Sequence, residues 1–157
     1  MRYTESVLGS SLHTRRLSGL SRRTGLKPTT AAVNGICFGG GCEIIINCDI
    51  MIAFPSAAFA LPEVKRGVVA IAGALPRLVQ TIGRQRAIEI CLTGRVFTAK
   101  EAAEWDLVNK VVNDVVQGVM DMAHMNAENS PDAVIVSREG IKMGWEGVCA
   151  EEGTRLW

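Results

Sequence analysis

Aromatic side chains and an excess of one charge sign are both missing from this sequence. Only 5% of the 157 residues are Phe, Trp or Tyr, and the formal net charge at pH 7 is +1. Such a chain has neither the electrostatic attraction nor the stacking surfaces typical of nucleic-acid-binding proteins. We therefore expect no nucleic acid among its partners.

Metal-ligand spacings and long hydrophobic runs are missing as well. The two histidines, His13 and His124, lie far apart, and the five cysteines contain no Cys-x-x-Cys pair. This pattern argues against a zinc site or a disulfide framework, and favours reduced thiols in an intracellular protein. No apolar run is long enough to cross a bilayer. We expect neither a metal nor a membrane span.

The N-terminal region is basic and serine-rich. Residues 1–27 hold six Lys and Arg residues and five serines against one acid, Glu5. This composition resembles a mitochondrial transit peptide, but a helix and loop left from a truncated domain is the favoured interpretation. The C-terminus is not a peroxisomal Ser-Lys-Leu signal. The predicted organisation is a poorly ordered segment over residues 1–18 and one partial domain over 19–157.

Hydrophobic residues make up 48% of the chain, which is enough for a buried core in one α/β domain. A helix between two β-branched apolar runs predicts a β-α-β unit with parallel strands. The expected strands cover residues 29–33, 50–54, 57–60 and 107–112. One expected helix follows the glycines at 39–41 and ends near residues 47–48. The other expected helices cover residues 76–82, 84–92, 98–105, 114–129, 131–143 and 146–157.

Three successive glycines, Gly39, Gly40 and Gly41, precede the first expected helix. Glycine lets the backbone present N–H groups to a ligand, and a helix start adds the positive end of its dipole. The run is no P-loop, because no Gly-Lys-Ser/Thr follows. It is no dinucleotide fingerprint either, because Ile44 stands where a third glycine is needed. A developing oxyanion suits such a site, although from the pattern alone a flexible turn is the simpler interpretation.

Two acids stand in apolar surroundings and are candidate acid and base groups. Glu43 follows the glycines, and Glu63 follows Pro62 after an apolar run. A carboxylate among apolar neighbours is costly unless it is exposed, paired or used. Glu43 also suits a helix start electrostatically, and Glu63 also suits a solvated loop. Two carboxylates facing one cavity share acid and base duties around one water.

The order of these motifs resembles the core signature of the crotonase-type enoyl-CoA hydratase/isomerase family. The similarity extends from about residue 19 to the C-terminus. Its motifs are Ala31-Ala32-Val33-Asn34-Gly35, Gly39-Gly40-Gly41-Cys42-Glu43, Cys48-Asp49, Phe59-Ala60-Leu61-Pro62-Glu63, Leu92-Thr93-Gly94-Arg95, Ala99-Lys100-Glu101-Ala102 and Leu107-Val108.

The resemblance implies a partial β-β-α superhelix with a helical C-terminal portion. It implies that the Gly40 N–H is one donor of an oxyanion hole, and that Glu43 and Glu63 are the two catalytic acids. Gly39 and Gly41 then shape the substrate-binding loop. Having both acids favours hydration over isomerisation, since many isomerases of the family lack an acid at the position of Glu43.

The sequence departs from the family pattern at three places. Ile71 stands in the substrate-binding region where a glycine N–H commonly helps to hold the water. Trp105 and Asp106 replace a small Ala-Gly pair. The N-terminal half, with the second oxyanion donor and much of the coenzyme A site, is expected to be absent, and the C-terminal helices to be cut short. The chain alone is therefore expected to have little activity.

The resemblance predicts syn-type addition of water to a 2-enoyl-CoA in fatty-acyl or secondary-metabolite acyl metabolism, including β-oxidation. Coenzyme A is then part of the substrate, and no separate cofactor is expected. The alternatives are a non-catalytic truncated homologue that associates with full-length subunits, and an enoyl-CoA isomerase. A trimer-based homo-oligomer and a peroxisomal or mitochondrial location are further expectations.

Overall fold

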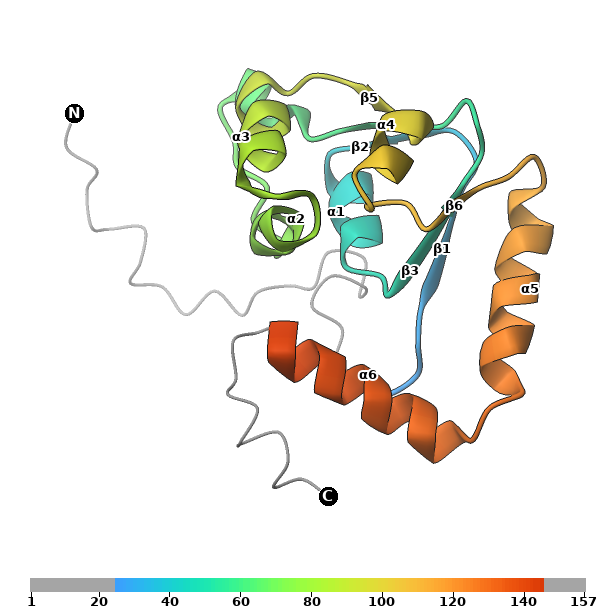
Figure 1. Ribbon diagram of the computed structural model, residues 1–157. Helices are drawn as coiled ribbons and strands as arrows, with labels where there is room; N and C mark the ends of the chain where they lie inside the picture. Colours follow the sequence, from blue (N-terminus) through green and yellow to red (C-terminus); the bar gives the residue numbers. More distant parts are fainter. Residues whose placement is uncertain (1–24, 146–157) are drawn as a thin grey trace.

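A computed structural model describes residues 25–145 of the chain. Within this range two small sheets are surrounded by helices (Figure 1). The strands are β1 (Thr30–Val33), β2 (Ile36–Phe38), β3 (Ile50–Ala53), β4 (Ala58–Ala60), β5 (Phe97–Thr98) and β6 (Lys110–Val111). The helices are α1 (Gly40–Ile46), the 3-10 helix η3 (Pro62–Arg66), α2 (Ala74–Ile82), α3 (Arg84–Thr93), α4 (Ala99–Glu104), α5 (Val115–Ala127) and α6 (Pro131–Trp145).

The strand pairing confirms a partial β-β-α superhelix. One sheet has the order β1-β3-β6, with every pair parallel, and the other has the order β2-β4-β5. Strands β2 and β4 are parallel, whereas β5 runs antiparallel to β4. The chain thus alternates between the sheets from β1 to β4, and the last two strands, β5 and β6, add one strand to each sheet. The predicted β-α-β unit of β1, α1 and β3 is present.

The core lies between the sheets and the helices α1 to α4. Phe59 of β4 and Phe97 of β5 are fully buried, and their ring centroids are 5.5 Å apart. Helix α2 contributes Leu78 and Ile82, which lie four residues apart and therefore on one face. Burying one such large side chain stabilises the fold by about 1.5–3 kcal/mol. This packing fixes η3 and the start of α1, where the candidate acids lie.

Three local expectations were wrong or incomplete. Strands β2 and β5 were not predicted, because runs of three and two residues are too short for a clear pattern. The strand expected at 107–112 is reduced to Lys110–Val111, because Asp106 has a φ of 61° and turns the chain just before it. Glu63 lies on a 3-10 helix rather than in an irregular loop. The expected domain boundary at 18/19 and the last predicted helix, at 146–157, lie outside the described residues.

Trp105 has a packing role in this fold. Its ring lies 5.5 Å from that of Phe97, and the guanidinium groups of Arg86 and Arg95 lie 5.6 Å and 5.4 Å from its centroid. Cations placed over a tryptophan ring are attracted to its electron-rich face. The substitution of a small residue by Trp105 is therefore accommodated at the edge of the core.

The first strand of each sheet along the chain is an outer strand. Strands β1 and β2 are each first in their sheet, so among the described residues each pairs on one edge only. Ile36 of β2 is 79% exposed. An open strand edge that carries an apolar side chain is a surface on which another strand adds readily.

Candidate active site

The glycine loop is fixed to the end of strand β4. Gly39 donates its N–H to Ala60 O at 2.9 Å, and its own carbonyl accepts the N–H of Glu43 at 2.9 Å. Gly39 has φ 57° and ψ −128°, a conformation that L side chains rarely adopt. The chain then enters α1 at Gly40, in the first turn, where the N–H groups have no intrahelical acceptor. The role of the Gly40 N–H in an oxyanion hole stays a prediction.

Glu63 lies against this loop. It sits in the first turn of η3, directly after Pro62, and is half-buried. A Cβ atom placed on Gly39 lies 3.4 Å from Glu63 Oε1, so only a residue without a side chain leaves this space open. Oε2 of Glu63 is buried and has no hydrogen-bond partner among the described residues. A buried carboxylate oxygen without a partner is unfavourable, and it is available to a substrate or water proton.

Glu43 is the more deeply buried of the two acids. Its side chain extends from the first turn of α1, and the residue is 5% exposed. Its Oε2 accepts the backbone N–H of Ala72 at 2.6 Å. A short bond from an N–H to a carboxylate stabilises the ionised form. Glu43 is thus hydrogen-bonded to Gly39 through its backbone, and the Glu63 carboxylate lies beside the open side of the same glycine.

Two residues that the sequence did not indicate complete the surroundings of Glu43. Asn47, one turn further along α1, donates its side-chain amide to the carbonyls of Glu43 (2.7 Å) and Ala72 (3.2 Å). Arg77 of α2 donates to the Asn47 carbonyl at 3.1 Å. The one available sequence signal is an asparagine four residues after the acid on a buried helix face.

The remaining predicted residues, Ile71 and Gly41, are both exposed to solvent. Ile71 is 73% exposed and directly precedes Ala72, whose N–H contacts Glu43. Gly41 is exposed on α1, and a Cβ there meets only Cys37 Sγ, at 3.8 Å. Their roles in substrate binding stay predictions.

The cysteine thiols near the loop are poor nucleophiles. Burial, with a smaller contribution from Cys48, raises the pKa of Cys37 to about 11. Burial also raises the pKa of Cys42 well above its usual range, and the negative charge of Glu63 adds to this effect. The thiolate is the reactive form, and it is scarce at neutral pH in both residues. The two carboxylates therefore remain the predicted acid and base groups.

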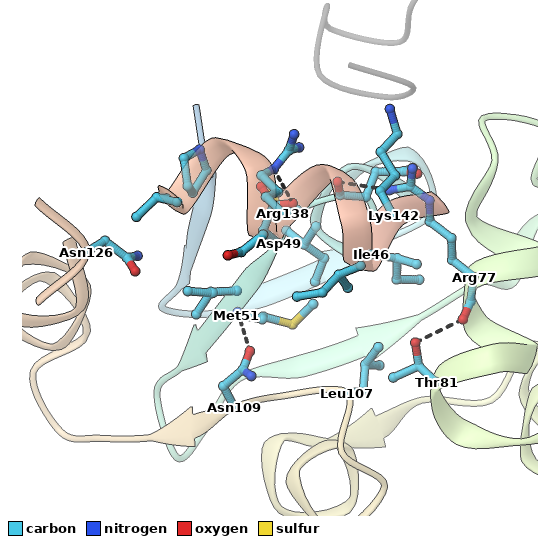
Figure 2. A pocket seen from close by; sticks show the side chains of 18 of the residues that line it. Ile46, Asp49, Met51, Arg77, Thr81, Leu107, Asn109, Asn126, Arg138 and Lys142 are labelled. Carbon is cyan, nitrogen blue, oxygen red and sulfur yellow. Dashed lines mark hydrogen bonds and ion pairs between the residues drawn. The ribbon is translucent and has the colours of Figure 1, made fainter. Parts of the chain in front are cut away.

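A cavity of about 690 Å³ lies beneath α6 (Figure 2). Ile46, Met51 and Leu107 line its apolar part, and Arg138 pairs with Asp49 at 2.8 Å on its rim. Its lining contains neither of the candidate acids. It does contain Asn47 and Arg77, so the cavity adjoins the surroundings of Glu43.

Within residues 25–145, no three His, Cys, Asp or Glu side chains are grouped closely enough to hold a metal ion. No helix in the same range has the length and apolar character needed to cross a membrane.

Comparison with known proteins places these features in a family. The profile described as enoyl-CoA hydratase/isomerase matches residues 17–148. The mevalonyl-coenzyme A hydratase sidH of Aspergillus fumigatus is 49% identical over 140 residues, which cover 88% of this chain and 52% of that protein. The probable mitochondrial enoyl-CoA hydratase of Dictyostelium discoideum is 40% identical over 132 residues, or 83% of this chain and 47% of that protein.

The fold comparison agrees. The crystal structure of a probable enoyl-CoA hydratase/isomerase from Mycobacterium abscessus superposes with a TM-score of 0.84 at 35% identity, over 99% of this chain and 62% of that one. The chain spans about half the length of the curated relatives described above.

Proposed function

Because the chain belongs to the enoyl-CoA hydratase/isomerase family, we propose that its site adds water to the 2,3-double bond of an enoyl-CoA thioester. The observation that carries the proposal is that both acids adjoin the glycine loop, where Glu63 has a buried Oε2 without a hydrogen-bond partner among the described residues. Glu43 donates its backbone N–H to Gly39 O, and Glu63 Oε1 lies 3.4 Å from the Cβ position of Gly39. The neighbouring Gly40 N–H then serves the thioester oxygen.

In the proposed reaction, the carboxylate of Glu43 takes a proton from water while the water oxygen forms a bond to C3. The electrons of the double bond move onto the thioester oxygen, where Gly40 stabilises the enolate charge. The enolate then takes a proton from the carboxyl of Glu63 at C2. The N–H of Ala72 holds the Glu43 carboxylate in place at 2.6 Å. Glu63 suits the acid role because its Oε2 is not committed to any other described group.

The likeness to the Aspergillus protein directs the choice of substrate. Its name specifies mevalonyl-CoA, a 3-hydroxyacyl thioester, and a hydratase site also runs in the dehydrating direction on such compounds. We therefore include mevalonyl-CoA beside crotonyl-CoA as a candidate substrate. A role in secondary-metabolite acyl chemistry or β-oxidation, a trimer-based assembly, and a mitochondrial or peroxisomal location remain part of the proposal.

The test measures hydration of crotonyl-CoA and dehydration of mevalonyl-CoA by the purified chain. A second series uses the chain co-expressed with the N-terminal half of the Aspergillus relative, because the match covers 52% of that protein. Glu43→Gln or Glu63→Gln is expected to lower kcat by about 10²–10⁴ with a smaller change in KM. Turnover unaffected by either substitution, or no turnover in both series, contradicts the proposal.

A second candidate is a non-catalytic subunit that associates with full-length homologues. The exposed Ile36 on the open edge of β2 favours it, because an added strand covers both features. This candidate predicts no turnover in either series, together with a stable complex with a full-length homologue in size-exclusion chromatography. The product distinguishes the isomerase alternative from hydration. An isomerase shifts the double bond of the enoyl-CoA without adding water to it.

A further inference from the structure

The hydrogen bonds around Glu43 form a closed ring. The N–H of Ala72 donates to Glu43 Oε2 at 2.6 Å, and the carbonyl of the same Ala72 accepts the side-chain amide of Asn47 at 3.2 Å. The same amide donates to the Glu43 carbonyl at 2.7 Å, across one helical turn. The backbone of Ala72 is therefore held at its N–H by the Glu43 carboxylate and at its carbonyl by the Asn47 side chain.

The orientation of the Asn47 amide follows from its partners. Both neighbours are carbonyl oxygens, so the NH₂ group faces them, because an amide oxygen there has no donor to accept from. The residue is 9% exposed, and Oδ1 is buried without a partner among the described residues. Arg77 holds the Asn47 backbone carbonyl at 3.1 Å and so ties the end of α1 to α2. The two hydrogen bonds that the Asn47 amide donates therefore offset the cost of burying this polar side chain.

Side-chain packing alone fixes the Ala72 segment weakly. Its buried anchors are Ala70 and Ala74, which contribute one methyl group each, whereas Val69 and Ile71 are exposed. A buried methyl or methylene group contributes only about 0.8 kcal/mol. Hydrogen bonding to a charged group contributes about 1.5–3 kcal/mol. The direction of the Ala72 peptide is therefore set mainly by Glu43 and Asn47.

We propose that Asn47 is a positioning residue for Glu43, acting through the Ala72 peptide. Its side-chain amide binds the Ala72 carbonyl, and this keeps the Ala72 N–H hydrogen-bonded to the Glu43 carboxylate. The catalytic meaning rests on the proposed function, in which Glu43 is the base. The coupling of Asn47, Ala72 and Glu43 is a property of the folded chain and is measured without turnover.

The test uses nuclear magnetic resonance on the 157-residue chain. In the wild type, the Ala72 amide proton should resonate downfield, exchange slowly, and shift when Glu43 is protonated. The side-chain amide protons of Asn47 should exchange more slowly than those of Asn113, which is exposed. Asn47→Leu keeps the approximate shape of the side chain but removes its N–H donors. Asn47→Ser has too short a side chain to reach the carbonyls of both Glu43 and Ala72. In either variant the Ala72 amide should move upfield and exchange about tenfold faster or more.

Asn109→Ala is the matched control. Asn109 Oδ1 accepts the N–H of Met51 at 2.7 Å, so this variant also loses one bond between an asparagine side chain and a distant backbone group. It is expected to lower stability and to leave the Ala72 amide signal unchanged. An equal Ala72 response in both kinds of variant would mean that Asn47 has only a general structural role. Fast exchange of the Asn47 side-chain amide in the wild type overturns the proposal without any variant.

The kinetic readout separates this proposal from the proposed function. In a preparation that turns over, Asn47→Leu should lower kcat about tenfold and leave KM nearly unchanged, because a misplaced base affects the chemical step. A raised KM with an unchanged kcat contradicts the positioning role. If no preparation turns over but the Ala72 amide responds as described, the hydratase proposal fails and the Asn47 coupling stands.

Discussion

The conformation of Gly39 leads to a sharp prediction for the substitution Gly39→Ala. With φ 57° and ψ −128°, this residue lies where L side chains are strained, and an alanine there is expected to cost about 1–3 kcal/mol. The new Cβ lies 3.4 Å from Glu63 Oε1, which is ordinary contact and adds little. The backbone term therefore dominates. We expect a loss of unfolding free energy of about 2 kcal/mol.

Gly41→Ala provides the control, two residues further along the chain, inside α1. Gly41 has no positive φ, and a Cβ at this position meets only Cys37 Sγ, at 3.8 Å. Alanine is favoured over glycine inside a helix by about 0.5–1 kcal/mol, so this variant should be neutral or more stable than the wild type. The two glycine substitutions are therefore expected to differ by about 2–3 kcal/mol, with opposite signs.

Urea unfolding followed by circular dichroism measures both free energies. For a chain of this size the loss in Gly39→Ala corresponds to a melting temperature lower by about 4–8 °C. If Gly39→Ala and Gly41→Ala have equal effects, strain at Gly39 does not set the loop conformation. In a preparation with turnover, Gly39→Ala should also lower kcat, because it displaces the Gly40 N–H next to the carboxylate of Glu63.

Further predictions concern a carboxylate, a thiol and a turn. The hydrogen bond from the N–H of Thr98 is the main cause that lowers the pKa of Glu101 from its usual 4.5. The stability that Glu101 contributes is therefore present above pH 4.5 and is lost as the pH falls. The unfolding free energies of the wild type and Glu101→Gln should converge in acid. Because the Cys37 pKa is about 11 instead of 9.0, alkylation of this thiol at pH 8, followed by mass spectrometry, should be about 100-fold slower than for free cysteine. Replacing Asp106, at φ 61°, with glycine should raise the unfolding free energy by about 0.5–1 kcal/mol; an unchanged value means that Asp106 is not strained.

Much of the fold could be predicted from local sequence patterns. Thr98 and Glu101 lie three residues apart, and the structure contains the capping box that this spacing predicts. Strands β1 and β3 and the helix between them follow the predicted pattern, with bounds that differ by a residue or two. These features depend on neighbours in the chain, so composition and spacing suffice.

The surroundings of the acids could be predicted only in part. The sequence identified Glu43 and Glu63 as candidates, together with the glycines before α1, because acids in apolar surroundings are unusual. It did not indicate Asn47 or Ala72. An asparagine on a helix and an alanine in a loop carry no chemical signal until their partners are known.

The sequence by itself determined the family, the order of most helices and of the longer strands, and the residue types available for proton transfer. Tertiary structure decided which atoms meet. The N–H of Ala72 lies 29 residues from Glu43, and it reaches the carboxylate because α2 packs against α1 and brings the preceding loop with it. Such a contact depends on the packing of several elements at once. A local pattern does not contain that information, because loop geometry follows from the whole core rather than from adjacent residues.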